Sequence, residues 1–93
     1  MSATPTQTTA FQQHLLKTWP PYFREVKANR KTFELRRNDR DFRQGDILVL
    51  VEFDPETGTE SGDIETRRAG YILHGPGFGL EAGFCVISLE HVA

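Results

Sequence analysis

Cysteine and long apolar runs are scarce in this chain of 93 residues. The single cysteine, Cys85, cannot form an internal disulfide, which is typical of a protein in a reducing compartment. No apolar stretch approaches the roughly 18 residues that a membrane-spanning helix needs. The opening MSATPTQTTA lacks both the basic and the apolar region of a secretory signal. We therefore expect a cytoplasmic protein that does not interact with membranes.

Residue types that bind metals are also few and scattered. The three histidines, His14, His74 and His91, form no CxxC or HxxxH spacing with one another or with Cys85. Such spacings preorganise structural zinc sites, so we expect no metal and no cofactor. Cys85 lies in an apolar run and is interpreted as a buried, inert thiol. A Cys85–His74 dyad is the disfavoured alternative.

The length and composition indicate one small domain. A chain that is 38% hydrophobic and 26% charged is ordinary for a soluble globular protein. At this length it builds a single core. We expect a flexible tail over residues 1–10 and one domain over residues 11–93.

The net charge of -2 hides two segments of opposite sign. The basic segment, residues 24–43, has eight Lys or Arg against four Asp or Glu, which gives +4. The acidic segment, residues 44–66, has seven Asp or Glu and no base, which gives -7. A local basic face can bind a few phosphates through counterion release. Alternatively, the two segments pair with each other across the fold, and the sequence leaves both possibilities open.

The only clear helical pattern follows a short first strand at residues 14–18. Four apolar residues then recur at i, i+3, i+4 and i+7, namely Trp19, Tyr22, Phe23 and Val26. This spacing predicts one amphipathic helix whose apolar stripe faces the core. We interpret the aromatic residues of this stripe as core and not as a surface on which bases stack.

Both ends of this helix carry signals. Thr18 is the expected N-cap, and Pro20 and Pro21 are tolerated only in a first turn, where N–H groups lack helical partners. The helix is expected to end at Ala28-Asn29, because Asn tolerates the left-handed conformation that closes many helices.

Alternation of apolar and polar residues predicts a strand after the helix. In residues 32–36, Phe33 and Leu35 share one face, and Thr32, Glu34 and Arg36 share the other. We expect the first face to lie in the core and the second to be polar.

The rest of the chain is rich in β-pattern. Residues 47–53, ILVLVEF, predict a central strand covered on both sides, and residues 54–63 a polar loop. A return strand at residues 64–73 and a last strand near the C-terminus flank HGPGFG. This glycine-rich stretch lacks the Lys-Ser/Thr of a phosphate loop and is interpreted as a hairpin turn. The prediction is an α+β fold, a small, mostly antiparallel β-barrel with one main N-terminal helix.

A recognisable motif runs from His14 to Leu48, and the similarity that it supports covers roughly residues 12 to 90, with the last third weaker. It reads His-x-Leu-Lys, Pro-x-x-Phe, Gly-Lys-Lys-Thr-x-Glu-x-Arg, Asn-Asp-Arg-x-Phe and Gly-Asp-x-Leu. It is met by His14, Leu16, Lys17, Pro20, Phe23, Lys31, Thr32, Glu34, Arg36, Asn38, Asp39, Arg40, Phe42, Gly45, Asp46 and Leu48. On this basis the chain resembles the small ASCH-like domains of the PUA-like superfamily, specifically an uncharacterised family of short bacterial and phage proteins. It departs from that pattern at Asn29, usually glycine, and at Asp63, where relatives often carry an arginine.

The resemblance implies a PUA-like β-barrel with a ligand cleft beside the first helix, and a module that binds RNA or a nucleotide-like ligand. Charge-assisted hydrogen bonds from basic side chains suit phosphate, and carboxylate or amide groups suit base edges or ribose hydroxyls. The expected ligand-binding residues are Lys17, Lys31, Thr32, Glu34, Arg36, Asn38 and Arg40.

A second function implied by the resemblance is hydrolysis. One branch of ASCH-like domains resembles small amidohydrolases that deacylate N4-acylated cytidine with a lysine, a threonine and a glutamate. Lys31 matches that lysine, but Glu34 stands where the threonine nucleophile is expected. Thr32 is expected on the same side of the strand as a substitute. Catalysis is therefore the less favoured interpretation.

Two further alternatives compete with ligand binding. The acidic stretch from Asp46 to Glu65 could contact a basic host partner, as in a phage-type interaction protein. The motif could also be purely structural, with Arg36 paired to Asp46 or Glu34 and with Asn38 closing an Asx-turn.

Overall fold

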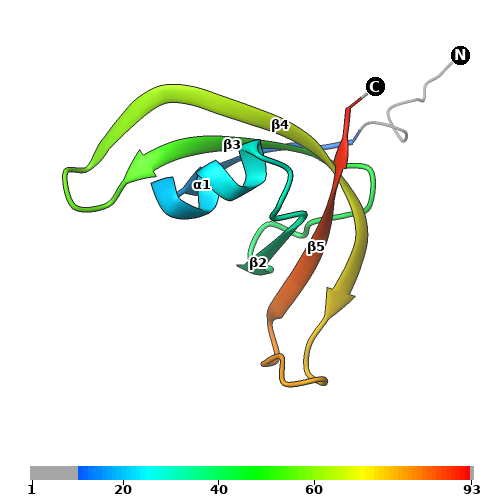
Figure 1. Cartoon of the computed structure of the whole chain (residues 1–93). Coiled ribbons are helices and arrows are strands. Elements are labelled where there is room, and N and C mark those ends of the chain that lie inside the picture. Colours follow the sequence, from blue (N-terminus) through cyan, green and yellow to red (C-terminus); the bar gives the residue numbers. More distant parts are fainter. Residues whose placement is uncertain (1–10, 93) are drawn as a thin grey trace, which may run out of the picture.

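The computed structural model describes residues 11–92, which form one five-stranded sheet and one helix. The elements are β1 (Gln13–Thr18), α1 (Pro20–Lys27), β2 (Phe33–Arg37), β3 (Ile47–Asp54), β4 (Thr59–His74) and β5 (Phe84–His91). The sheet curls into a half-barrel, and α1 lies on its concave side (Figure 1). The predicted α+β class and barrel-like sheet are confirmed. Residues 1–10, for which a flexible tail is expected, lie outside the described residues.

The strand order is β1-β3-β4-β5-β2, so β1 and β2 are the two edges. The pairing of β1 with β3 is parallel and the other three pairings are antiparallel. The long strand β4 produces the curl, because its first part pairs with β3, its last part pairs with β5, and its register shifts between Ala69 and Ile72. At this bend a Cβ on Gly70 would meet the carboxylate of the exposed Glu90 side chain, which would have to move aside.

The core lies between α1 and the concave face of the sheet. The helix contributes Phe23 and Val26 to it. Strands β1, β3 and β5 supply most of the remaining buried apolar side chains, which include Leu16, Leu48, Leu50, Cys85, Ile87 and Leu89. The buried thiol expected at Cys85 is confirmed, and burial raises its pKa above the ordinary value.

The helix begins one residue later than its predicted cap. Trp19 is the N-cap, while the Thr18 hydroxyl donates to the Leu16 carbonyl, so the capping role predicted for Thr18 is wrong. Pro20 and Pro21 occupy the first turn as expected, and because they lack N–H groups they leave little for a capping side chain to accept. The end is as predicted, with Asn29 in the left-handed region at φ 62°.

The β3–β4 hairpin is longer than the hydrophobic pattern predicts. Residues 54–63 are not all loop, since β3 extends to Asp54 and β4 begins at Thr59. Backbone pairing of Asp54 with Thr59 and of Phe53 with Glu60 continues the ladder beyond the core. Strand residues there are largely solvent-exposed on both faces, so polar side chains are tolerated and periodicity gives no signal.

A buried polar cluster fastens β1 to the turn that precedes β3. The Asp46 carboxylate accepts hydrogen bonds from the backbone N–H groups of Gln12 (3.1 Å) and Arg43 (3.0 Å) and from His14 Nε2 (2.9 Å). The ring of Phe42 packs edge-on against His14. Burial alone would raise the pKa of Asp46, but the hydrogen bonds outweigh it and hold this pKa below its ordinary value.

The helix α1 is too short and too polar to span a membrane, and residues 11–92 contain no other helix that could do so.

Candidate functional site

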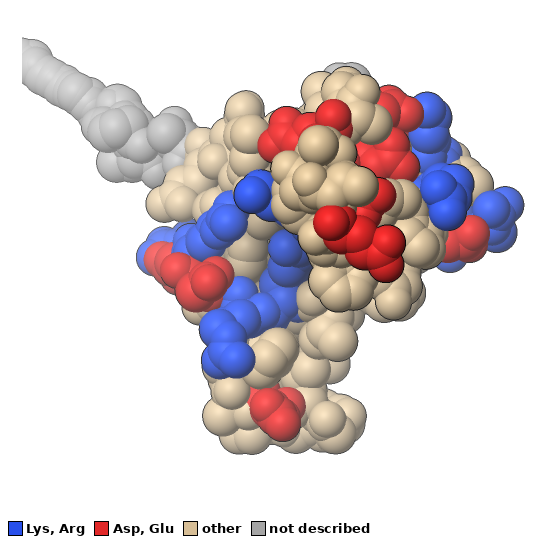
Figure 2. Space-filling model, turned by 90° about the vertical axis from the view of Figure 1, so that its left-hand side faces the viewer, with Lys and Arg blue, Asp and Glu red and all other residues tan. Residues whose placement is uncertain are grey.

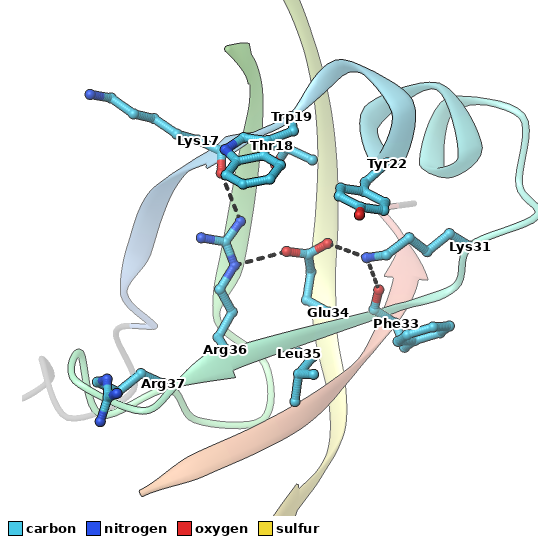
Figure 3. A pocket seen from close by; sticks show the side chains of 10 residues that line it. All are labelled: Lys17, Thr18, Trp19, Tyr22, Lys31, Phe33, Glu34, Leu35, Arg36 and Arg37. Atoms are coloured by element: carbon cyan, nitrogen blue, oxygen red, sulfur yellow. Dashed lines mark hydrogen bonds and ion pairs between the residues drawn. The ribbon is translucent and has the colours of Figure 1, made fainter. Parts of the chain in front are cut away.

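A pocket of about 630 Å³ opens between the start of α1 and the edge strand β2 (Figure 3). The end of β1 and the first turn of α1 form one wall, and β2 together with Lys31 forms the floor and the other wall. The lining residues are Lys17, Thr18, Trp19, Tyr22, Lys31, Phe33, Glu34, Leu35, Arg36 and Arg37. Four residues of the motif singled out in the sequence, Lys17, Lys31, Glu34 and Arg36, thus line the larger of the two described pockets.

The polar centre of the pocket is Glu34, which is only 3% exposed. Its Oε1 accepts a hydrogen bond from Lys31 Nζ at 2.6 Å and its Oε2 one from Arg36 Nε at 2.9 Å. Lys31 Nζ also donates to the Phe33 carbonyl at 2.6 Å. A buried carboxylate is expensive unless it is paired and hydrogen-bonded, and here it has a cation on each side.

The predicted facing of β2 is wrong. The alternation itself is present, but Phe33 and Leu35 are 47% and 55% exposed, while Glu34 points inward. Because Lys31 and Arg36 compensate its charge, Glu34 can occupy the inner face of the strand. The two apolar side chains are left at the rim of the pocket.

Two aromatic side chains stand over this floor (Figure 3). Trp19 and Tyr22 are each 52% exposed, and their rings are stacked with centroids 6.3 Å apart and planes at 28°. The prediction that they belong to the core is therefore wrong. An eight-residue helix buries one face, and Phe23 and Val26 already fill it. The signal that could have revealed this is Pro20-Pro21, which starts the helix after Trp19 and so removes Trp19 from the helical stripe.

Two motif arginines contact the edge strand β1, Arg36 from β2 and Arg40 from the connection between β2 and β3. Arg36 Nη2 donates to the Lys17 carbonyl at 2.9 Å, and Arg40 Nη1 donates to the Leu15 carbonyl at 2.6 Å. Both acceptors lie on β1, an edge strand whose ladder partner is β3. The arginines therefore satisfy main-chain groups on an exposed sheet edge, which otherwise invites pairing with another chain.

The seven predicted ligand-binding residues divide into two groups. Those in the pocket lining are Lys17, Lys31, Glu34 and Arg36, whereas Thr32, Asn38 and Arg40 do not line it. Thr32 directly precedes β2 and is exposed, and its backbone carbonyl accepts a hydrogen bond from the Leu89 N–H. The Asn38 side-chain oxygen accepts a hydrogen bond from the Phe42 N–H at 2.9 Å, a local turn contact of the kind considered above. The expected alternative pairing of Arg36 with Asp46 does not form, because each has other partners.

Two further basic side chains lie at the edges of the pocket. Lys17 and Arg37 both line it and both extend outward from its floor (Figure 3). Lys17 Nζ is 4.6 Å from the centroid of the Phe53 ring, and the Arg37 guanidinium is 4.6 Å from that of Phe84. Arg37 was missed at the sequence level, although it directly follows Arg36.

The basic and acidic segments remain largely separate in space. Among residues 11–92, Lys27–Asp63 (2.5 Å) is the one ion pair that joins them. The other ion pairs of the basic segment are internal to it: Arg30–Glu25, Lys31–Glu34, Arg36–Glu34 and Arg43–Asp41. Figure 2 shows Lys and Arg side chains gathered along a hollow of the surface, with many acidic side chains on a neighbouring part. Mutual pairing of the two segments therefore does not explain the charge pattern.

The comparison with protein families matches residues 13–89 to DUF3850, a domain of unknown function. The chain belongs to this family. The match contains all the residues that line the pocket of this DUF3850 domain. A comparison with curated proteins gives no match. Within residues 11–92 no group of three or more His, Cys, Asp or Glu is placed to hold a metal ion.

Proposed function

We propose that this DUF3850 domain is an ASCH-like member of the PUA-like superfamily and binds RNA or a nucleotide in the pocket between α1 and β2. The observation that carries the proposal is the pair of exposed, stacked rings of Trp19 and Tyr22 above a charged floor. The volume of about 630 Å³ lies in the range of pockets that hold small ligands.

The aromatic wall favours a planar ligand. Two large rings that stay half exposed on a small domain forgo part of their hydrophobic stabilisation, and unstacked bases are commonly recognised on such rings. Stacking of one base on an aromatic side chain contributes about 1–3 kcal/mol to binding.

The outward basic side chains favour a ligand with phosphate. Lys17 and Arg37 extend away from the floor on the β1 and β2 sides, where they can contact phosphates attached to a base in the pocket. The domain's net charge of -2 gives little general attraction to nucleic acid, so binding should depend on this local site.

The amidohydrolase alternative has less support. Thr32 is exposed and lies outside the pocket lining, so its hydroxyl is not among the groups that a ligand in the pocket meets. Both of these charged groups are already held by hydrogen bonds within the site. Turnover of N4-acetylcytidine that is lost in Lys31→Ala would revive this alternative.

The test uses Trp19, the only tryptophan of the chain, as its own reporter. Mononucleotides and short single-stranded and duplex RNAs are titrated at two salt concentrations while its fluorescence is followed. Labelled RNA and anisotropy then compare wild type with Trp19→Ala. We expect salt-sensitive binding that weakens roughly 5- to 150-fold in the variant, the equivalent of about 1–3 kcal/mol.

Phe78→Ala is the matched control, because Phe78 is 93% exposed and lies outside the pocket. It removes an aromatic side chain without touching the proposed site, so its affinity should equal that of wild type. The proposal fails if no RNA or nucleotide binds in a salt-sensitive manner, or if Trp19→Ala binds as tightly as wild type.

A further inference from the structure

The Glu34 carboxylate retains unused hydrogen-bonding capacity. An ionised carboxylate has about four acceptor sites, two on each oxygen. Among the described residues, Oε1 accepts from Lys31 and Oε2 accepts from Arg36, which leaves capacity on both oxygens. Glu34 lines the pocket, but its side chain is only 4% exposed, so a ligand reaches the two oxygens only by lying directly against the floor.

A donor stands next to these acceptors. The Lys31 ammonium has three N–H groups and uses two, for Glu34 Oε1 and for the Phe33 carbonyl. The Lys31 side chain is partly exposed and lines the pocket, so its third N–H is available to a ligand. Across the floor, the order of groups is therefore donor, acceptor, acceptor, and the Arg36 guanidinium follows beyond Oε2.

Guanine has the complementary order on its Watson–Crick edge. Its O6 is an acceptor, and its N1–H and N2–H are adjacent donors that match the two oxygens of a carboxylate. Cytosine presents a donor followed by two acceptors, uracil has a single donor between acceptors, and adenine has no second adjacent donor. We propose that Glu34 and Lys31 make this pocket selective for guanine, an inference that rests on the proposed nucleotide-binding function.

The selectivity follows from the cost of an unmatched carboxylate. When a base enters the pocket, the Glu34 carboxylate loses hydrogen bonds from water. A base that turns acceptors toward the carboxylate supplies no donors to replace these hydrogen bonds. A well-formed bidentate contact to a base discriminates by roughly 5- to 150-fold. The aromatic wall of Trp19 and Tyr22 adds affinity for every base and so does not contribute to selectivity for guanine.

The experiment titrates the full chain with GMP, IMP, AMP, CMP and UMP and follows Trp19 fluorescence. IMP lacks only the N2 amine of GMP, so it tests the contact with one carboxylate oxygen. We expect GMP to bind most tightly, IMP about 5- to 20-fold more weakly, and AMP and CMP more weakly still. Equal affinities, or tighter binding of any other base, would overturn the inference and leave the proposed function intact. Absence of binding by all five and by RNA would overturn both.

A protein variant provides the complementary test. Glu34→Gln keeps the side-chain length but replaces one acceptor with a donor, so the preference for GMP over AMP should disappear. Glu56→Gln, in the exposed β3–β4 loop, removes a carboxylate elsewhere and should keep the preference. Circular dichroism checks that Glu34→Gln folds, and if it does not, the comparison of GMP with IMP on the wild-type protein still decides the question. A folded Glu34→Gln with an unchanged preference would refute the role of Glu34.

Discussion

Replacement of Asp46 with alanine should destabilise this DUF3850 domain by about 3–5 kcal/mol. The residue is 1% exposed, and its carboxylate accepts hydrogen bonds from Gln12, His14 and Arg43. Hydrogen bonds to a charged group contribute about 1.5–3 kcal/mol each, but bonds that share one acceptor group are not additive. Even a loss of about 3 kcal/mol is a fifth or more of the roughly 5–15 kcal/mol that stabilises a typical domain.

The contribution of Asp46 should also depend on pH, because its hydrogen bonds hold its pKa below the ordinary value. A lowered pKa in the folded state means that the unfolded chain takes up the proton first as pH falls. The stabilisation is complete above about pH 4, the ordinary pKa of Asp, and is lost as pH falls below it. Asp46→Asn has no such proton to bind, so its stability should fall less steeply over this range.

Urea unfolding followed by Trp19 fluorescence, at a series of pH values, measures both effects. Asp39 provides the control, since it is exposed and forms no hydrogen bond or ion pair among the described residues. Asp39→Ala should stay within about 0.5 kcal/mol of wild type. A loss below about 1 kcal/mol in Asp46→Ala, or the same acid dependence in Asp46→Asn and wild type, would refute the reasoning.

Three further predictions concern stability and reactivity. Asn29→Ala should lower the free energy of unfolding by about 1 kcal/mol in urea, because Asn29 has φ 62°, which alanine adopts with strain. Asn29→Gly should be no less stable than wild type, and an alanine variant as stable as wild type would contradict this. Cys85 should react with a thiol reagent only after unfolding in urea, since it is buried and its pKa is raised, and rapid labelling of the folded protein would count against that burial. Arg40→Ala removes the donor to the Leu15 carbonyl, so it should lower the free energy of unfolding by about 1 kcal/mol and speed amide hydrogen exchange in β1. Its RNA affinity should stay within about twofold of wild type. A large loss of affinity would instead place Arg40 in the binding site.

Local signals in the sequence predicted most of the fold. Pro20-Pro21 and Asn29 marked the ends of α1 within one residue, because backbone geometry at helix ends depends on few residues. The apolar run of residues 47–53 identified β3 as a central strand, which lies between β1 and β4. The polar half of the β3–β4 hairpin could not be recognised, since its ladder is specified by backbone pairing and not by burial.

The candidate site was predicted less completely. Period-two alternation in β2 separates two faces but does not say which one turns inward. Hydrophobicity favoured Phe33 and Leu35, and the structure has Glu34 there instead, because Lys31 and Arg36 approach it from either side. Such compensation depends on side-chain placement in three dimensions, which a spacing pattern does not contain.

The choice between a binding site and an internal salt-bridge network is therefore not exclusive. Burial of a carboxylate is costly unless it is paired and hydrogen-bonded, so the ion pairs of Glu34 with Lys31 and Arg36 are what stabilise an acceptor group at the pocket floor. Substitution of Lys31 or Arg36 must then disturb packing and recognition together, and it cannot separate the two roles. Trp19 can separate them, because its ring is half exposed and supports the pocket without holding the core.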